Sequence, residues 1–352
     1  MHSSQPRIRV SVLGAGAWGT ALAAAAATHH DVCLWARDID LIQSMSANRQ
    51  NMRYLPGLDL PASIHFTADI TQAIEHGTAQ STQTPAIIIL GTPVIGLRDI
   101  CARLSQHFHA SNQTATQPKT SIVWTCKGLD PQTGQLPHEI VAQALGASAH
   151  YSLGVLSGPS FAKEVAQGLP VALTVASVDE SLRALVREIF HHDPMRIYAT
   201  TDVVGVEVGG ALKNIMAIAC GIADGLALGN NARAALITRG LAEMTRFGVK
   251  IGADAATFSG LTGLGDLVLT STGELSRNRQ VGLALGKGQS LSDILASGST
   301  AEGVRCAQAV SIRAKSLGVD MPITDAVCQV LFHHVPVKQA VSQLLAREAK
   351  SE

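Results

Sequence analysis

The chain has 352 residues, with 27 Lys and Arg against 27 Asp and Glu, so its formal net charge is zero. This balance argues against nucleic acid or an anionic membrane surface as a partner, because both attract proteins through a basic surface. Hydrophobic residues make up 46% of the chain and charged residues 15%, and the length is sufficient for two domains with separate cores.

The cysteines and the start of the chain indicate a reducing compartment. The six cysteines are scattered and none forms a Cys-x-x-Cys pair, so we expect buried reduced thiols rather than disulfides or zinc ligands. The polar first residues lack an apolar signal region, which predicts a cytoplasmic protein. The most hydrophobic region, 209–229, is interrupted by Lys213 and Asp224, so we expect no apolar run of membrane-spanning length.

Residues 10–24 have the pattern of a short apolar strand, a glycine turn and an alanine-rich helix. Gly14 permits a tight turn, Gly16 lets a pyrophosphate approach the backbone, and Gly19 lets the helix pack against a sheet. The helix start presents free N–H groups and a partial positive charge. A second expected strand at 30–35 completes the pattern, which predicts a dinucleotide-binding turn. The alternative is a glycine-rich connection that binds nothing.

Two charged residues follow the second expected strand, where cofactor choice is set in dinucleotide-binding domains. In NAD-specific domains an acidic residue near this point binds the ribose hydroxyls, whereas an arginine can accommodate the 2′-phosphate of NADP. Here Arg37 comes first and Asp38 follows. We favour NADPH or dual use through Arg37. A solvent-exposed arginine, with Asp38 in the NAD role, is the alternative.

Strands and helices alternate along the first part of the chain, as a doubly wound sheet requires. Residues 86–90 are apolar throughout and predict a buried strand, which residues 91–93 follow with a second turn at the ligand-binding edge. Residues 51–57 predict a loop closed by a Pro-Gly turn, and the polar segments 77–85 and 109–119 predict surface loops. The other expected elements are strands at 10–13, 30–35, 64–66, 120–125, 152–156, 171–176 and 195–198 and helices at 69–76 and 180–190.

From residue 202 onward the apolar spacing becomes helical, and a glycine-rich loop at 259–266 interrupts it. We therefore predict an α/β N-terminal Rossmann-type doubly wound sheet over residues 1–198 and an all-α C-terminal domain over residues 199–352. The expected helices of the second domain are 203–223, 232–249, 277–285, 291–296, 304–316, 323–332 and 337–347.

Lys213 is the first candidate for chemistry outside the glycine turn. Its near neighbours in the expected helix are Gly, Ala, Leu, Ile and Met. A lysine that is simply solvated would lie on a polar helix face, which these neighbours do not form. Burial disfavours the charged form and lowers the pKa of a lysine, which can then exchange a proton near neutrality. The alternative is a lysine that extends along an apolar surface to reach solvent.

Lys127 and Asp266 are weaker candidates. Lys127 lies on a turn after an expected strand, and Gly128 leaves room for a ligand, although a loop lysine is usually only solvated. Asp266 ends the glycine-rich loop and could accept a hydrogen bond from a substrate hydroxyl or cap a helix.

Residues 275–279, Leu-Ser-Arg-Asn-Arg, lie at the start of an expected helix. Ser276 can cap this helix. The same free N–H groups, with Arg277 and Asn278, can instead bind a phosphate. A nicotinamide fold, a proton-transfer lysine and a phosphate site together suggest reduction of a phosphorylated ketone.

Several motifs occur in one order along the chain, at 14–23, 127–129, 157–164, 209–214, 231–240, 263–267 and 276–279. On these motifs the chain, from about residue 8 to residue 345, resembles the bacterial NAD(P)-dependent glycerol-3-phosphate dehydrogenase family. The polar segments 77–85 and 109–119 are the main departures, since they are longer than is usual for the family.

The resemblance implies reversible reduction of dihydroxyacetone phosphate to sn-glycerol 3-phosphate by NADPH or NADH, which supplies glycerophospholipid synthesis. It implies Lys213 as proton donor and acceptor and Lys127 as the residue that holds substrate oxygens and helps to lower the pKa of Lys213. It implies a homodimer and no metal. The implied substrate-binding residues are Lys127, Gly158, Ser160, Lys213, Asp266, Ser276, Arg277 and Asn278. The implied cofactor-binding residues are Gly14, Gly16, Ala17, Trp18, Gly19, Arg37, Tyr54, Lys127, Ala162, Arg277, Thr300 and Glu302.

Two other functions remain open on the residues. A 3-hydroxyacid or 6-phosphogluconate type of dehydrogenase shares a Rossmann plus helical plan and uses a helical lysine. The segments 231–240 and 276–279 favour the glycerol phosphate family over it. A non-catalytic nucleotide sensor would need neither the two lysines nor the phosphate site.

Overall fold

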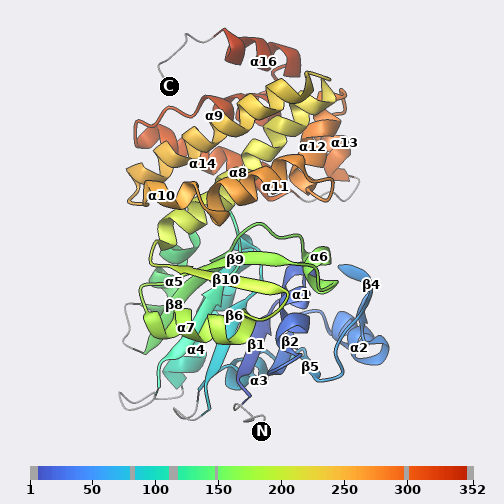
Figure 1. Ribbon diagram of the computed structural model, residues 1–352, viewed down its shortest axis with the longest axis vertical. Helices are drawn as coiled ribbons and strands as arrows, with labels where there is room; N and C mark the ends of the chain where they lie inside the picture. The colour runs from blue at the N-terminus through green and yellow to red at the C-terminus, as the bar shows by residue number, and fades with distance from the viewer. Residues whose placement is uncertain (1–6, 80–83, 111–117, 147–149, 297–300, 347–352) are drawn as a thin grey trace. The chain divides into compact units, whose positions relative to one another are not determined.

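The computed structural model describes residues 7–79, 84–110, 118–146, 150–296 and 301–346 (Figure 1). The chain forms two compact units. The first consists of Met1–Cys126 and Pro137–Val203, and the second of Lys127–Leu136 and Val204–Glu352. The first unit contains a sheet covered by helices and the second is helical, which confirms the predicted fold class.

The division of the chain differs from the predicted boundary at residue 198 in two respects. Strand β10 (Met195–Thr200) runs past that residue, and the first unit ends at Val203. The segment Lys127–Leu136 belongs to the second unit, because Leu129 and Leu136 are buried in the helical core. This segment follows a strand of the sheet directly, so its sequence position gave no sign of the change.

The first unit is built on one eight-stranded sheet with the order β10-β9-β8-β7-β6-β1-β2-β5. Strands β3 and β4 form a separate two-stranded hairpin, which comes between β2 and β5 in the sequence. The strands are β1 (Arg9–Leu13), β2 (Asp31–Trp35), β3 (Gln50–Asn51), β4 (Leu55–Asp59), β5 (Ile64–Thr67), β6 (Ala86–Leu90), β7 (Thr120–Trp124), β8 (Tyr151–Ser157), β9 (Val171–Ala176) and β10. The helices are α1 (Ala17–Ala26), α2 (Ile39–Asn48), α3 (Ile70–His76), α4 (Val94–Ala110), α5 (Pro137–Leu145), α6 (Ala162–Ala166) and α7 (Glu180–Phe190).

Two layers of helices sandwich this sheet. Helix α1 packs against α6 and α7, and α4 packs against α3 and α5. Successive strand side chains point to opposite faces, so β1 and β6 turn Val10, Val12, Ile87 and Ile89 into the same buried cluster as Leu22 of α1. The apolar runs of the parallel strands are thus buried on both faces, which is why they lack polar alternation.

The sheet is parallel except between β8 and β9, which pair antiparallel. The predicted loop over residues 51–57 was wrong. Pro56 and Gly57 lie inside β4 rather than closing a loop, and the turn of that hairpin is at residues 52–54. The predicted loops 77–85 and 109–119 include residues 80–83 and 111–117, which lie outside the described residues.

The regular elements of the second unit are all helices among its described residues, and the segment Lys127–Leu136 is a loop without a helix. The central helix of the unit is α8 (Val203–Gly225), which is buried along almost its whole length. A single π-helical turn, η1 (Leu261–Gly265), occupies the predicted glycine-rich loop. The other helices are α9 (Gly229–Lys250), α10 (Ala255–Phe258), α11 (Asp266–Thr272), α12 (Arg277–Gly286), α13 (Leu291–Ala296), α14 (Glu302–Ser316), α15 (Pro322–Phe332) and α16 (Val337–Leu345).

Helix α8 corrects the expectation that no apolar run is long enough to span a membrane. Among the described residues it is the one helix that passes a length and composition test, with a mean hydropathy of 1.5. However, 89% of the apolar 18-residue stretch of this helix is buried inside the protein. A buried central helix of a helical core passes the same test, so its apolar character is explained by packing.

Glycines let two other elements approach α8 closely. A Cβ at Gly221 of α8 would lie 2.1 Å from the carbonyl oxygen of Arg279, and one at Gly282 of α12 would lie 2.1 Å from that of Ile218. Helices α8 and α12 therefore pack backbone against backbone. Similarly, a Cβ at Gly209 would lie 2.2 Å from the carbonyl oxygen of Thr262 in η1. These contacts fix η1 and α12 against α8.

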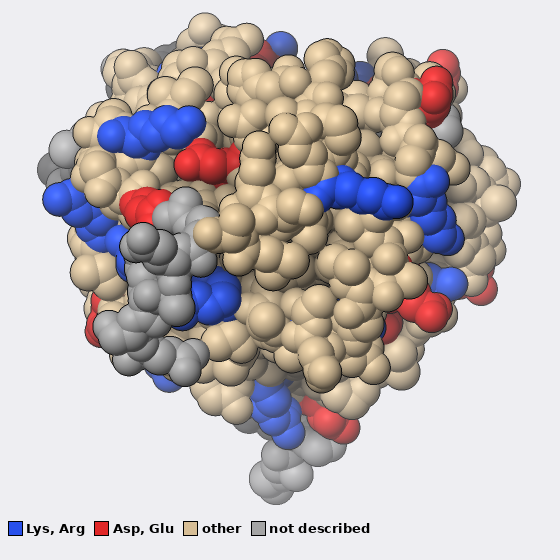
Figure 2. All heavy atoms as spheres, turned by 90° about the horizontal axis from the view of Figure 1, so that it is seen from above, with Lys and Arg blue, Asp and Glu red and all other residues tan. Residues whose placement is uncertain are grey.

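Charged side chains are dispersed on the face seen in Figure 2, where Lys and Arg lie among acidic and uncharged residues without forming one continuous basic patch. The six cysteines are all buried and free, as their apolar surroundings predicted.

Candidate active site

The glycine turn between β1 and α1 lies against the turn that follows β6. Strand β1 pairs in parallel with β2 and β6, with Leu13 level with Trp35 and Leu90. Gly14 has a φ of 131°, and a Cβ there would lie 2.8 Å from the carbonyl carbon of Gly91. Only glycine combines this backbone conformation with so close an approach. The two turns therefore meet at the carboxyl edge of the sheet, where such folds bind ligands.

The residues at this edge fit a dinucleotide. A Cβ built on Gly19 would lie 2.0 Å from the carbonyl oxygen of Gly14, so Gly19 is needed to bring α1 against the turn. A Cβ on Gly16 would meet no described atom within 4 Å beyond its chain neighbours, which leaves open space beside the backbone. Helix α1 has no side-chain cap and no acidic residue in its first turn. The buried Thr92 hydroxyl after β6 has no hydrogen-bond partner among the described residues. An anionic pyrophosphate suits these free donors.

The other predicted cofactor residues of the first unit surround this edge. Ala17 and Trp18 begin α1 and Ala162 begins α6, and all three pack against the first core. Arg37 is exposed just past β2, and Tyr54 lies half-exposed in the β3–β4 turn.

Two predicted substrate residues also lie in the first unit, after β8. Gly158 has a φ of 141°, which favours glycine, and the hydroxyl of Ser160 donates to its carbonyl oxygen at 3.2 Å. Thr300 lies outside the described residues.

The second unit brings Lys213, Asp266 and Lys127 together. The ammonium of Lys213 donates to Oδ1 of Asp266, and that of Lys127 donates to Oδ2 at 2.7 Å. The aspartate is fully buried, whereas 7% of the Lys213 side chain and 15% of the Lys127 side chain are exposed. Two cations thus share one carboxylate, which leaves a net positive charge in a site that is nearly closed to solvent.

Burial and the charges of the neighbouring groups shift the pKa values of both Lys213 and Asp266. Burial and the charge of Lys127 together lower the pKa of Lys213 to about 8, against the opposing effect of Asp266. Burial alone would raise the pKa of Asp266, but Lys127 and Lys213 outweigh it and hold the pKa below its usual value. At neutral pH the carboxylate is therefore ionised, and Lys213 carries a proton that it can give up readily.

A chain of amide contacts joins α8, α12 and α14 beside these lysines. The Asn278 amide donates to Oδ1 of Asn214 at 2.9 Å, and its own oxygen accepts from the backbone N–H of Gly303 at 2.9 Å. The Asn214 amide in turn reaches Oε2 of Glu302 at 3.5 Å. Asn278 and Glu302 were predicted for substrate and cofactor, respectively, and the structure connects them through Asn214.

The sequence at the start of α12 predicted either a helix cap at Ser276 or a phosphate site with Arg277 and Asn278. The hydroxyl of Ser276 caps the helix by accepting from the backbone N–H of Arg279 at 3.2 Å. Arg279 is engaged elsewhere, in an ion pair with Asp224 at 2.7 Å. Arg277 is exposed in the first turn of the helix. A guanidinium at a helix start suits the binding of an anion.

Three residues of these sites were missed in the sequence. Thr270 lies one turn after Asp266 in α11 and donates to its Oδ1 at 3.2 Å, a spacing that could have been recognised. Asn214 adjoins Lys213 and could have been proposed with it. Asn51 is buried and donates to the Ala15 carbonyl oxygen in the glycine turn at 2.9 Å, and no local pattern indicated that contact.

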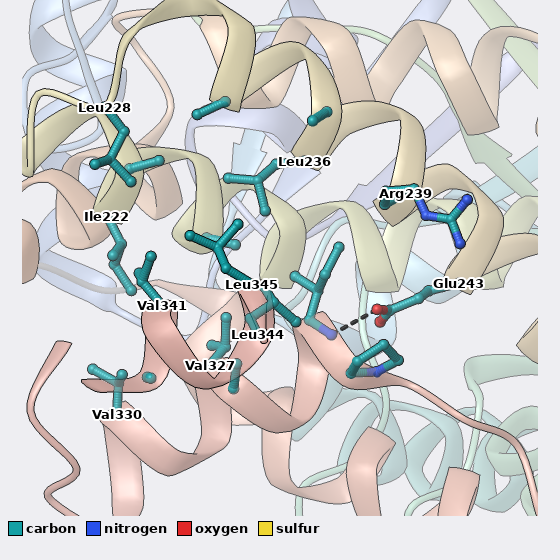
Figure 3. A pocket seen from close by; sticks show the side chains of 18 of the residues that line it. Ile222, Leu228, Leu236, Arg239, Glu243, Val327, Val330, Val341, Leu344 and Leu345 are labelled. Carbon is teal, nitrogen blue, oxygen red and sulfur yellow. Dashed lines mark hydrogen bonds between the residues drawn. The ribbon is translucent and has the colours of Figure 1, made fainter. Parts of the chain in front are cut away.

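A cavity of about 760 Å³ lies elsewhere in the second unit, among α8, α9, α15 and α16 (Figure 3). Its wall is mainly aliphatic, including Ile222, Leu236 and Val341, with Arg239 and Glu243 together at one side. None of its described lining residues belongs to the lysine–aspartate cluster. The candidate catalytic groups of this unit therefore lie in the lysine–aspartate cluster and not in this cavity.

A dinucleotide turn on a parallel sheet and a buried, acid-paired lysine define the class of nicotinamide-dependent oxidoreductases. The sequence matches the N-terminus of NAD-dependent glycerol-3-phosphate dehydrogenase over residues 9–183 and the C-terminus over residues 202–342. The chain belongs to the NAD(P)-dependent glycerol-3-phosphate dehydrogenase family.

Individual relatives agree with this assignment over nearly the whole chain. It is 55% identical to the glycerol-3-phosphate dehydrogenase (NAD(P)+) of Ralstonia nicotianae, covering 98% of this chain and 99% of the relative. The Burkholderia cenocepacia protein of the same name is also 55% identical, over 98% of this chain and 100% of the relative. The crystal structure of glycerol-3-phosphate dehydrogenase from Coxiella burnetii is similar with a TM-score of 0.87 and 38% identity, over 97% of this chain and 99% of that one.

Proposed function

We propose that this protein catalyses the reversible NAD(P)H-dependent reduction of dihydroxyacetone phosphate to sn-glycerol 3-phosphate, with Lys213 as proton donor and acceptor. The names of the two bacterial relatives support the reaction. One observation carries the role of the lysine: Lys213 is buried on α8, paired with Asp266, and has a pKa lowered to about 8. A lysine with such a pKa suits proton exchange near neutrality.

When bound, the reduced nicotinamide supplies a hydride to the C2 carbonyl carbon. The C=O double bond becomes a single bond, and the oxygen gains the negative charge. The Lys213 ammonium then gives its proton to this oxygen, an O–H bond forms, and the neutral amine regains a proton from water. In the reverse direction the neutral amine of Lys213 accepts the hydroxyl proton.

Lys127 and Asp266 support this transfer electrostatically. The Lys127 ammonium stabilises negative charge as it develops on the carbonyl oxygen, which lowers the barrier because the cation is already held in place. Asp266 keeps Lys213 protonated by countering the charge of Lys127. Thr270 holds the carboxylate in position through its hydroxyl.

The phosphate and the cofactor are assigned to the remaining predicted residues. Arg277 is proposed to bind the substrate phosphate at the start of α12, where Ser276 and Asn278 fix the geometry of the helix. Gly158 and Ser160 stay predicted substrate contacts. Gly14, Gly16 and Gly19 are proposed to hold the pyrophosphate through the backbone. The other proposed cofactor contacts are Ala17, Trp18, Arg37, Tyr54, Lys127, Ala162, Arg277, Thr300 and Glu302.

The wider role follows from the chemistry of the product. sn-Glycerol 3-phosphate is the backbone onto which glycerophospholipids are built, so the enzyme is proposed to supply their synthesis. We also propose that it acts in the cytoplasm as a homodimer, with NADPH as the preferred cofactor and NADH tolerated.

The deciding experiment follows NADPH absorbance with dihydroxyacetone phosphate, with dihydroxyacetone as the control that lacks the phosphate. Wild-type protein should turn over the phosphorylated ketone only, and Lys213→Ala should lower kcat by about a hundredfold or more. A folded, NADPH-binding wild-type protein without turnover would overturn the proposal. Unchanged turnover by Lys213→Ala would contradict the proposed role of Lys213 as proton donor and acceptor.

A further inference from the structure

The turn between β3 and β4 is fastened to the dinucleotide turn. Asn51 is fully buried, and its amide donates to the Ala15 carbonyl oxygen at 2.9 Å and to the Thr20 hydroxyl at 2.8 Å. Its oxygen accepts from the backbone N–H of Tyr54 at 3.1 Å. Both amide hydrogens and one of the two lone pairs of the amide oxygen are thereby used. The position of residues 52–54 relative to the glycine turn is therefore fixed by a buried anchor.

This anchored turn presents Arg53 to the carboxylate of Asp38. Nη1 of Arg53 donates to Oδ2 of Asp38 at 2.9 Å, and the guanidinium lies 5.3 Å from the ring centroid of Tyr54. The other oxygen of Asp38 caps α2 by accepting from the backbone N–H of Leu41 at 3.1 Å. Each oxygen of the carboxylate thus already accepts one hydrogen bond.

These two contacts change what Asp38 can do for a cofactor. A free acidic residue at the end of β2 would bind ribose hydroxyls and repel a 2′-phosphate. Here the negative charge is countered by Arg53, and the exposed Arg37 adds a second guanidinium next to it. These three side chains together carry a charge of +1, while Asp40, exposed in the first turn of α2, adds a carboxylate two residues after Asp38. The two guanidinium groups favour an added phosphate dianion.

We propose that Arg53 is a specificity-determining residue that binds the 2′-phosphate of NADP(H) and withholds Asp38 from the ribose. A guanidinium has five N–H donors, so Arg53 can keep its contact with Asp38 and still donate to a phosphate. Its side chain is 60% exposed, which leaves those donors accessible. This inference deepens the proposed function and rests on nucleotide binding at the glycine turn.

The test measures binding of two fragments that differ only in the 2′-phosphate, namely 2′,5′-ADP and 5′-ADP, by isothermal titration calorimetry. The proteins are wild type, Arg53→Ala and the matched control Arg103→Ala. Arg103 is likewise an exposed arginine in an ion pair, with Asp99 on α4, and lies far from β2 in the sequence. Wild type and the control should bind 2′,5′-ADP more tightly than 5′-ADP.

In Arg53→Ala the affinity for 2′,5′-ADP should fall by about tenfold or more, as expected for a lost charge-assisted hydrogen bond, while that for 5′-ADP stays within about twofold. The KM for NADPH should rise in parallel while the KM for dihydroxyacetone phosphate holds. Equal losses for both fragments, or no loss for either, would overturn the inference. A selective loss in a protein that fails to reduce dihydroxyacetone phosphate would sink the proposed reaction and leave this inference standing.

Discussion

The buried ammonium of Lys213 donates to a carboxylate oxygen of Asp266, a residue 53 positions further along the chain. Helix α8 carries the lysine and helix α11 begins with the aspartate. The two meet because Gly209 lets the carbonyl oxygen of Thr262 approach to where a Cβ would sit, so that η1 lies directly on α8. A contact between backbones, four residues before each of the two charged groups, thus sets the geometry of their pair.

Replacing Asp266 with Asn should strongly lower the rate of reduction while changing the shape of the side chain little. Asp266 raises the pKa of Lys213 against burial and against the charge of Lys127. Without it, the lysine loses its proton at a lower pH and can no longer act as the acid at neutrality. We expect kcat for reduction to fall by about a hundredfold or more, measured by NADPH absorbance at pH 7.

A matched control is Asp325→Asn, which removes a carboxylate bound to Ser311 in the same unit, outside the site. It should leave kcat within about twofold, since surface and rim substitutions change little. If Asp266→Asn kept full activity at pH 7, the carboxylate would have no part in holding the proton on Lys213.

The two reaction directions should depend on pH in opposite ways. In the proposed mechanism reduction needs the protonated lysine, and the pKa of Lys213 is lowered to about 8, chiefly by burial. The rate of reduction should therefore be level below that pH and fall about tenfold per unit above it. Oxidation of glycerol 3-phosphate needs the neutral amine, so its rate should rise up to about pH 8 and then level off. Steady-state kcat between pH 6 and 10 measures both, and a reduction rate that stays level to pH 10 would rule out Lys213 as the acid.

Two glycines of the dinucleotide turn should respond differently to alanine. Gly16 has an allowed φ of −71° and open space around its Cβ position, so Gly16→Ala should leave the unfolding free energy within about 1 kcal/mol. Its methyl group would occupy the space proposed for the pyrophosphate, and NADPH affinity should fall about tenfold or more. Gly19→Ala would collide with the Gly14 carbonyl oxygen and should cost about 1–3 kcal/mol as well as affinity.

Thermal unfolding and NADPH fluorescence titration of the two variants separate these effects. Equal NADPH affinity for Gly16→Ala and wild type would show that no phosphate lies beside that backbone.

Glu243 should make the second unit less stable as pH rises toward neutrality. Its carboxylate, labelled in Figure 3, accepts from the backbone N–H groups of Ile323, at 2.6 Å, and Thr324 at the start of α15. Burial nevertheless raises its pKa from 4.5 to about 7. The folded protein therefore holds a proton that the unfolded chain releases between these values, and unfolding free energy falls across that interval.

The substitution Glu243→Gln removes this titration while keeping an oxygen acceptor for α15. The loss of unfolding free energy between pH 5 and pH 7.5 should be smaller in the variant than in wild type by about 1–3 kcal/mol. Urea unfolding at several pH values measures it, with Glu274→Gln as an exposed control in the same unit. Parallel pH curves for Glu243→Gln and wild type would contradict the raised pKa.

Regular elements with strong local patterns were predictable residue by residue. The strands Ala86–Leu90 and Val171–Ala176 and the helix Glu180–Phe190 have the predicted bounds. In each, continuous apolar runs or an amphipathic spacing agree with the tertiary environment. The short α10 and α11 were missed, because four to seven residues among glycines carry too little periodicity.

In the candidate site, too, contacts between residues close in the sequence were predictable and contacts between distant segments were not. Lys213 was recognised from its apolar neighbours, and its lowered pKa agrees with that reasoning. Asp266 had two possible uses in the sequence, and Ser276 did too. The helix cap at Ser276 depends on a local N–H group and was foreseen, whereas the double ion pair at Asp266 joins three separate segments and was not.

The sequence by itself determined the two fold classes, the glycine turn and the identity of the main chemical groups, because these depend on residues close together in the chain. Tertiary structure decided which groups meet. Lys127 leaves the sheet unit for the helical core because Leu129 and Leu136 are buried there, and this alone brings it to Asp266. Asp38 is paired by Arg53 because buried Asn51 fixes a distant turn. Such pairings follow from long-range packing, which no local spacing encodes.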